Sequence, residues 1–255
     1  VKVARIVDSP WRRTVSQLTK TQRTAMRLQL SRRQRCRSDW RCAAAPRVVV
    51  SKGLGAPPAP PPAYRICERG NWMVLRGFVD EAERAALLRK ALGHMARGEL
   101  TANPCGPARF FAKADQEPAL FVDDLLQRMT ARCERCLRLE GRPADRALGR
   151  IISLIQEGGF VHRHTDAYHP GVPGHRPGEQ HLRCNIVVRL GHPSGRPVIE
   201  DAALDVAEGD LWVFFASRCM HETTPLQGAD PRIVYGFGWA VPENHVLEPP
   251  PEDAL

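Results

Sequence analysis

The spacing of apolar residues changes near residue 150 of this 255-residue chain. Before that point, apolar residues recur every three or four positions in two segments, 80–94 and 118–139, and this period predicts helices. Residues 101–117 are rich in Pro and Gly and predict loops around the short run 109–111. After residue 150, short apolar runs alternate with turn residues, a pattern typical of strands. The expected strands are 151–155, 159–166, 181–189, 210–215 and 232–239, with an earlier one at 72–75.

Helices followed by a series of strands predict a mainly β fold with flanking helices (α+β). The helical support is expected over 78–140, and a double-stranded β-helix (jelly roll) is expected over 150–240. Together these parts form one domain over residues 64–242. The chain is long enough for such a domain plus an appendage.

Both ends of the chain differ in composition from this domain. A Pro-rich linker at 53–62 ends a basic N-terminal segment, so residues 1–63 are interpreted as a leader with its linker. The leader is expected to be disordered or to be translated upstream sequence; contact with nucleic acid and organelle targeting are the alternatives. Residues 243–255 are rich in Pro and Glu and predict a loose tail.

Charge is divided unevenly between these parts. Residues 1–65 hold fifteen Lys or Arg against two acids, whereas residues 66–255 hold twenty-two against twenty-six. Net charges of +13 and −4 thus account for the total of +9. The basic character therefore belongs to the leader and not to the domain, where a nucleic-acid partner is not expected.

Cysteines and hydropathy bear on the compartment. Eight cysteines follow no repeating spacing, and Cys133-x-x-Cys136 lacks the second pair that a zinc site needs. No run of 18 apolar residues occurs, and no signal-peptide pattern opens the sequence. These features predict a soluble, cytoplasmic protein of a reducing compartment, with no membrane partner.

Two histidines and one aspartate form a candidate metal site. His164 and Asp166 are two residues apart in an expected strand, so both side chains project from one face. His221 follows the apolar run 210–215 and supplies a third ligand, while its rival His192 lies in a turn expected at the surface. Two imidazoles and one carboxylate with open positions are typical of the facial triad of non-haem Fe(II) oxygenases.

Arg232 begins an apolar strand eleven residues after His221. Its neighbours Ile233, Val234 and Phe237 favour burial, and a buried guanidinium without an anion is costly. A planar guanidinium binds a carboxylate through two parallel hydrogen bonds. The pattern therefore favours a role in binding a dicarboxylic ligand, and the alternative is a strand residue paired at the surface.

The series His164-x-Asp166, His221 and Arg232 resembles the Fe(II)/2-oxoglutarate-dependent dioxygenases, in particular the broad prolyl-hydroxylase-like group. The run 181–189 after the first two residues is similar to the same family. The resemblance implies an enzyme that uses Fe(II), 2-oxoglutarate and O2 to hydroxylate an unactivated C–H bond. Its substrate would be an amino acid, a peptide residue or a similar small molecule, and succinate and CO2 would be released. Arg232 would bind the C5 carboxylate of 2-oxoglutarate.

Further side chains are expected around the same pocket. Arg183 and Asn185 share one strand face, and the resemblance places them near the cosubstrate or the substrate; a polar network at the barrel mouth is the alternative. His162, two residues before His164, is expected to face inward as a pocket or rim residue. The Gly- and Pro-rich loop 167–180 is interpreted as a lid. Its candidate substrate contacts are Tyr168, His169, His175 and Arg176.

Three other functions are weighed against this one. A halogenase needs a small residue in place of the ligating carboxylate, and Asp166 argues against it. A catalytically inactive cupin-like binding module does not need a complete set of metal ligands, so the complete set in this sequence argues against it. A nucleic-acid-directed oxygenase would use the basic residues of 1–63. The chain also departs from the family, with 195–197 in place of a common Gly pair and Leu190 near the place of a cosubstrate-binding Tyr, which leaves the substrate class open.

Overall fold

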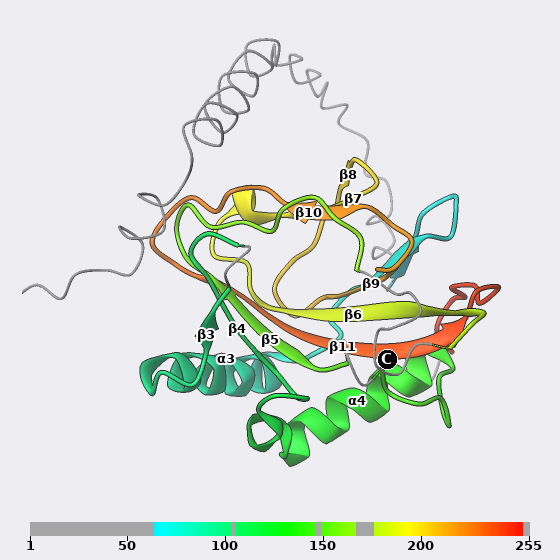
Figure 1. The fold of residues 1–255 in the computed structure, drawn as a ribbon, viewed down its shortest axis with the longest axis horizontal. Helices are drawn as coiled ribbons and strands as arrows, with labels where there is room; N and C mark the ends of the chain where they lie inside the picture. The colour runs from blue at the N-terminus through cyan, green and yellow to red at the C-terminus, as the bar shows by residue number, and fades with distance from the viewer. Residues whose placement is uncertain (1–63, 104–105, 146–148, 167–175, 252–255) are drawn as a thin grey trace, which may run out of the picture. The chain divides into compact units, whose positions relative to one another are not determined.

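The computed structural model describes residues 64–103, 106–145, 149–166 and 176–251. Within these ranges the chain forms a large antiparallel sheet, a small sheet and two α-helices. The helices lie on one side of the large sheet, and the small sheet lies on the other (Figure 1). The expected leader and residues 167–175 of the expected lid lie outside the described residues.

The two sheets form the jelly roll that the strand spacing predicts. In the small sheet, a bridge between His164 and His221 adds a further segment to one edge. The mainly β fold with flanking helices is thereby confirmed. The large sheet has the order β1 (Tyr64–Ile66), β2 (Trp72–Leu75), β9 (Leu211–Phe215), β6 (Glu179–Arg189), β11 (Arg232–Pro242), β5 (Ile151–Ile155), β4 (Arg109–Lys113) and β3 (Thr101–Ala102). The small sheet has the order β10 (His221–Thr223), β7 (Pro197–Ile199) and β8 (Ala202–Ala203).

Alternation along the strands divides the large sheet into an apolar and a polar face. On β6, Cys184 is buried in the hydrophobic core and its thiol contacts Cys133 of α4 (Asp124–Leu137). The flanking residues Arg183 and Asn185 project from the opposite face and line a cavity. The core therefore lies between the large sheet and the helices, and the polar cavity lies between the sheets.

The first predicted helix is confirmed as α3 (Glu81–Ala96). A capping box begins it, because the Asp80 side chain accepts from the Glu83 amide and the Glu83 side chain accepts from the Asp80 amide. Leu87 and Ala91 bury one side of the helix. In the described part of the chain, no helix is long and apolar enough to cross a membrane.

The second predicted helix, 118–139, is wrong at its start. Pro118–Phe121 forms a 3-10 turn, η1, and the chain turns again before α4. Asp123 starts α4 because its carboxylate accepts hydrogen bonds from two amides of the first turn, at 2.7 and 3.1 Å. The apolar period continues across this break, so periodicity alone merges the two elements. The buried residues of α4 are Leu125, Leu126, Met129, Cys133, Cys136 and Leu137.

Two other expectations are corrected around the site. Residues 101–102 and 112–113, which fall in the expected loops, belong to β3 and β4, and β4 pairs with β5 along its whole length. The predicted strand 159–166 is absent, because only His164 forms a bridge there. Gly158 has a positive φ of 75°, and Gly159 follows it, so the chain turns where a regular strand was expected.

The tail is also more ordered than its composition indicates. Leu247 is 8% exposed and belongs to the core cluster. The ring of His245 packs edge-on against Phe215, at 6.3 Å between centroids. Glu248 pairs with Arg138, just beyond α4. These three residues therefore anchor the described part of the expected tail to the domain, and residues 252–255 lie outside the described residues.

Candidate active site

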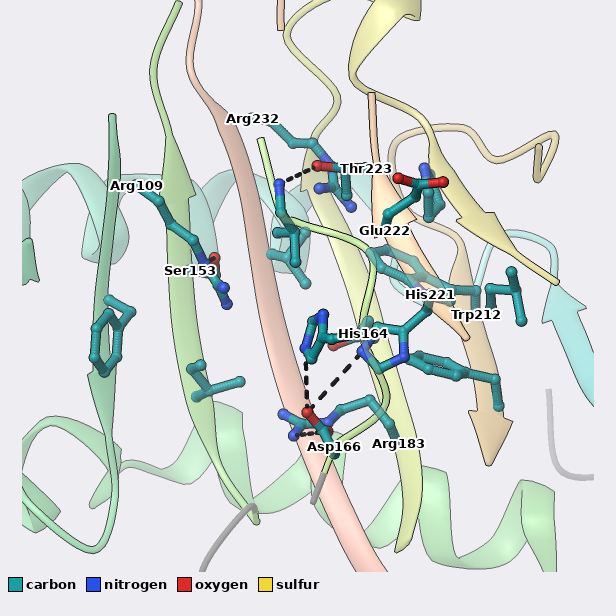
Figure 2. Close-up of a pocket in the computed structure, with 18 of the residues that line it drawn as sticks. Arg109, Ser153, His164, Asp166, Arg183, Trp212, His221, Glu222, Thr223 and Arg232 are labelled. Atoms are coloured by element: carbon teal, nitrogen blue, oxygen red, sulfur yellow. Dashed lines mark hydrogen bonds and ion pairs between the residues drawn. The ribbon is translucent and has the colours of Figure 1, made fainter. Parts of the chain in front are cut away.

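A cavity of about 350 Å³ lies between the two sheets. Strands β4, β5, β6, β9 and β11 contribute alternate residues to its floor. The small sheet and residues of 161–166 form the facing wall (Figure 2). The cavity is lined by all six residues that the sequence predicts for catalysis or for metal or cosubstrate binding: His164, Asp166, Arg183, Asn185, His221 and Arg232.

The two histidines and the aspartate of the predicted triad converge on one point of this cavity (Figure 2). One potential ligand atom of each lies within 4.8 Å of the others. Asp166 Oδ1 is 3.5 Å from His164 Nε2 and 4.0 Å from His221 Nε2. Within the described ranges, no other group of His, Cys, Asp and Glu has this arrangement.

Backbone hydrogen bonds fix the three residues relative to one another. The His164 amide donates to the His221 carbonyl at 3.0 Å, and the His221 amide donates to the His164 carbonyl at 2.8 Å. The Asp166 amide donates to the Ala216 carbonyl at 2.9 Å. The imidazole centroids consequently lie 4.2 Å apart. The chain holds the ligand set in place although 159–166 is not a strand.

Each imidazole of the triad has its protonation set by a backbone carbonyl. His164 Nδ1 lies 2.7 Å from the carbonyl of His162, and His221 Nδ1 lies 3.0 Å from the carbonyl of Cys219. Because a carbonyl only accepts hydrogen bonds, Nδ1 is the donor in both rings. The lone pair of each neutral ring is therefore on Nε2, the nitrogen that points toward Asp166.

The environment shifts the pKa values of the two imidazoles in opposite directions. Burial lowers the pKa of His221 to about 4, so this ring is neutral at pH 7. The hydrogen bond to Asp166 raises the pKa of His164, against the effect of burial. A cation in the site would replace the proton that Asp166 favours on His164.

Asp166 is held in its ionised form by Arg183. The Arg183 Nη2 donates to Asp166 Oδ2 at 2.9 Å. Burial by itself would raise the pKa of Asp166, but the charge of Arg183 and the bond to His164 hold that pKa well below its usual range. One carboxylate oxygen thus faces Arg183, and the other faces the imidazoles. Arg183 was expected near cosubstrate or substrate; in the structure it orients a member of the triad.

Sequence reasoning missed a buried pair behind this carboxylate. His181 is 0% exposed, its Nδ1 donates to Asp145 Oδ2 at 2.9 Å, and its Nε2 lies 4.0 Å from Asp166 Oδ2. Burial and the charge of Arg183 lower the pKa of His181. Its place two residues before Arg183, on the same strand face, was the available signal.

Arg232 is buried as its apolar neighbours predict. It is 4% exposed, and its Nε has no hydrogen-bond partner. The guanidinium lies 5.3 Å from the centre of the Trp212 ring. Burial lowers the pKa of Arg232 to about 9, and the like charge of Arg109 acts in the same direction. No carboxylate of the described residues pairs with it, so an anionic ligand is needed to compensate the charge.

Arg109 is a further cation of the cavity, and sequence reasoning missed it. Its Nε donates to Ser153 Oγ at 3.1 Å. The sequence predicts loops on both sides of the short run 109–111, and that run was given no role in the site. The available signal was alternation, which puts Arg109, Phe111 and Lys113 on one strand face. All three line the cavity.

Other candidate residues lie away from the cavity or outside the described ranges. His162 is exposed and contacts the Phe160 ring edge-on, at 4.6 Å, so the expectation that it faces inward is wrong. Its position follows from the absence of a regular strand at 159–166. Arg176 is exposed, and His192 is exposed in its turn as expected. The other candidate contacts of the lid, Tyr168, His169 and His175, lie outside the described residues.

Comparison with known proteins gives a match in structure. No protein-family model matches the chain, and no curated protein sequence matches it. SnoN, the non-haem α-ketoglutarate-dependent epimerase from nogalamycin biosynthesis, superposes with a TM-score of 0.50 at 16% identity, over 67% of this chain and 78% of that chain. A Pseudomonas putida prolyl-4-hydroxylase gives 0.46 at 17% identity, over 68% and 94% of the two chains. HygX from Streptomyces hygroscopicus gives 0.45 at 14% identity, over 68% and 84%.

SnoN is an epimerase that depends on α-ketoglutarate, which is 2-oxoglutarate, and HygX has been solved with nickel and 2-oxoglutarate bound. At 16% identity, the superposition with SnoN shows the fold. The chain therefore has the jelly-roll fold of a 2-oxoglutarate-dependent enzyme, and the expected resemblance is confirmed at the level of fold.

Proposed function

We propose that this chain is an Fe(II)/2-oxoglutarate-dependent dioxygenase that hydroxylates an unactivated C–H bond of an amino acid, a peptide residue or a similar small molecule. The observation that carries this proposal is the convergence of His164, Asp166 and His221, with ligand atoms within 4.8 Å, beside a buried arginine without an acid partner. The fold supports it, because SnoN has also been solved with Fe3+ and α-ketoglutarate.

The residues fit the iron and its cosubstrate. His164 and His221 present lone pairs on Nε2, and Asp166 presents an ionised oxygen, which is the donor set of a facial triad. Arg232 offers a desolvated guanidinium for the C5 carboxylate of 2-oxoglutarate. When bound, Fe(II) with 2-oxoglutarate and O2 supplies the oxidising chemistry, in which one oxygen atom enters the C–H bond and the other leaves in succinate, with release of CO2.

The remaining contribution comes from groups that position the ligands. Arg183 holds one oxygen of Asp166, which leaves the other directed at the imidazoles. The carbonyls of His162 and Cys219 orient the two rings. The Trp212 ring covers Arg232 and keeps water from its guanidinium. These groups act by geometry and exclusion of water, and none of them transfers a proton.

The charge of Arg232 provides the test that separates an enzyme from a binding module. Arg232→Gln removes a charge-assisted contact and leaves the triad untouched. Hydrogen bonds to charged groups contribute about 1.5–3 kcal/mol, so the affinity for 2-oxoglutarate is expected to fall about ten- to a hundred-fold. Iron affinity is expected to stay the same. An anaerobic titration of 2-oxoglutarate into the iron-loaded protein, followed through the metal-to-ligand charge-transfer band, measures the first affinity, and a titration of the metal-free protein with Fe(II) measures the second.

Arg189→Gln is the matched control. Arg189 lies at the far end of β6, outside the cavity, where it pairs with Asp230 at 3.3 Å. This variant is expected to bind 2-oxoglutarate like the wild type. Equal affinities in wild type and Arg232→Gln would remove Arg232 from the site. Absence of the band in the wild type would contradict the dioxygenase proposal and favour the binding module.

A further inference from the structure

The cavity contains more positive charge than its acids neutralise. Arg183 has a partner in Asp166, at 2.9 Å. Arg109 and Arg232 also line the cavity, and neither forms an ion pair with a carboxylate of the described residues. The three internal gaps between the described ranges contain no Asp or Glu in the sequence.

The remaining acid of the cavity wall, Glu222, does not compensate this charge. Its Oε1 lies 3.3 Å from Arg163 Nη1, on the outer side of the small sheet. Arg163 also pairs with Asp201 at 2.7 Å, so these three residues form a surface group of their own. Two cavity arginines are therefore left without an anion from the described chain.

The sheet register places the two arginines at the same level, one on each side of β5. Ile155 of β5 is the direct neighbour of Arg109 on β4 and of Arg232 on β11, so both arginines start at the same level of the floor. Their guanidinium groups then separate. Nε of Arg109 donates to Ser153 Oγ at 3.1 Å, and Ser153 is two residues along β5 from Ile155. Figure 2 shows the Arg109 guanidinium beside Ser153, pointing toward His164 from the side of the cavity away from His221.

The charge state of Arg109 agrees with this position. Burial lowers the pKa of Arg109 to about 10, the charge of Arg183 lowers it further, and Asp166 acts in the opposite direction. The guanidinium thus lies within the electrostatic reach of the triad. The Ser153 hydroxyl takes up one of its five N–H donors and leaves both terminal nitrogens for another acceptor.

One dicarboxylate cannot satisfy both cations. If 2-oxoglutarate binds the metal at one end and Arg232 at the other, Arg109 keeps an uncompensated charge beside the reacting centre. Arg109 is partly buried, and a planar guanidinium with two free terminal nitrogens fits a carboxylate. A second anion, separate from the cosubstrate, would compensate this charge.

We infer that Arg109 binds a carboxylate of the primary substrate, with Ser153 as the residue that positions its guanidinium. This inference rests on the proposed function and narrows the substrate class to small carboxylic acids, among them free amino acids. The carboxylate is bound on the floor beside Ser153, which places the rest of the molecule toward His164 and the triad. Primary amides of the same compounds lack the charge and bind poorly.

Matched acids and amides test this inference in the anaerobic complex of the full chain with Fe(II) and 2-oxoglutarate. Acetate, acetamide, and a panel of L-amino acids with their primary amides are titrated, and the perturbation of the charge-transfer band is followed. In the wild type, the acids that perturb the band are expected to bind at least about ten-fold more tightly than their amides. Arg109→Gln is expected to abolish this difference without weakening 2-oxoglutarate binding. Arg109→Lys is expected to retain part of it.

Several outcomes would overturn the inference. These are acids and amides of equal affinity in the wild type, an unchanged preference in Arg109→Gln, and a wild-type band that no carboxylate perturbs. Arg189→Gln is again the control and is expected to keep the preference. A wild type that forms no charge-transfer band at all fails the proposed function itself, so the two failures are distinguishable.

Stability without ligands gives a second, independent measurement. If Arg109 is a binding cation, then Arg109→Gln and Arg109→Met remove an unpaired, partly buried charge, and the Tm of the ligand-free protein is expected to stay the same or to rise. A structural role through Ser153 predicts that both variants, and Ser153→Ala, lower the Tm. A lower Tm in these variants, together with an unchanged preference of Arg109→Gln for acids over amides, would contradict the proposal.

Discussion

Each histidine of the triad is prepared as a ligand by a group that does not touch the metal position. The carbonyls two residues earlier, those of His162 and Cys219, bind Nδ1 and leave Nε2 with its lone pair. Because these contacts are to the backbone, substitution of His162 or Cys219 leaves them in place. The rings are thereby oriented by the local course of the chain, which side-chain changes around the site do not alter.

Loss of Asp166 is expected to be the most damaging single change at the site. Asp166→Ala removes the anionic ligand and leaves Arg183 as another unpaired cation. Turnover of 2-oxoglutarate should fall to background, and iron affinity should fall by more than about ten-fold, the loss already seen when second-layer partners of a metal site are removed. Succinate release and iron titration measure the two effects.

The control for this variant is Asp230→Ala. Asp230 is an exposed carboxylate that pairs with Arg189 outside the cavity. It should retain full turnover and iron affinity. Wild-type turnover in Asp166→Ala, with the fold intact by circular dichroism, would show that the triad is wrongly assigned.

The sequence allows the triad and Arg232 to be located because their spacing and apolar surroundings are local properties. The inward direction of Arg183 and Asn185 follows in the same way from alternation on a long strand. His162 is predicted wrongly, since alternation has no meaning where the chain forms a single bridge. Alternation places Arg109 on one strand face with Phe111 and Lys113, but its place near Arg232 depends on the registers of β4 and β11 against β5, which the local pattern does not give.

At the scale of elements, β11 makes room for the long polar side chains of its neighbour. Gly236 lies opposite Asn185, and Gly238 lies opposite Arg183. A Cβ on Gly236 would lie 2.6 Å from Ile151 Cγ2 and 2.9 Å from Asn185 Oδ1. The floor of the cavity is therefore open at this point because the strand carries no side chain there.

Two Gly→Ala substitutions are expected to change stability in opposite directions. Gly236→Ala forces atoms into a packed sheet and should destabilise the domain by about 1–3 kcal/mol. Gly93→Ala on α3 meets only the flexible end of Arg97, at 3.1 Å, and should gain up to about 1 kcal/mol from helix propensity. Denaturant unfolding of the two variants measures both effects. Equal stability of Gly236→Ala and wild type would show that the sheet yields at this point.

Elements were predictable where one signal dominated. The acidic first turn and apolar period of α3 define it, and the apolar runs of the central strands define those strands. The start of α4 was not predictable by period alone, because apolar residues continue through η1 and only the Asp123 cap separates the two. The packed tail was missed since its composition is typical of loops, whereas its order comes from Leu247 in the core.

For the whole molecule, the fold and site described here lie entirely within residues 64–251. Deletion of residues 1–62 is therefore expected to leave the Tm and the turnover of 2-oxoglutarate nearly unchanged, because the described residues already form both sheets, a hydrophobic core cluster and the predicted triad with Arg232. Thermal melting and succinate release of the truncated chain measure this. Failure of the truncated chain to fold would show that the segment contributes to the core.

The reciprocal hydrogen bonds between His164 and His221 also determine when a metal can be bound. The chain between these two residues must close on itself before the ligands meet, and loop closure costs conformational entropy. The hydrogen bonds of the small sheet offset that entropic cost before any metal ion binds. Under the proposed function, an unfolded chain would offer iron only the first two ligands, so high affinity would be acquired on folding, and the ion would in turn shift the folding equilibrium toward the native state. Metal loading would then be linked to completion of the jelly roll, and a partly folded chain would have no complete site with which to retain iron.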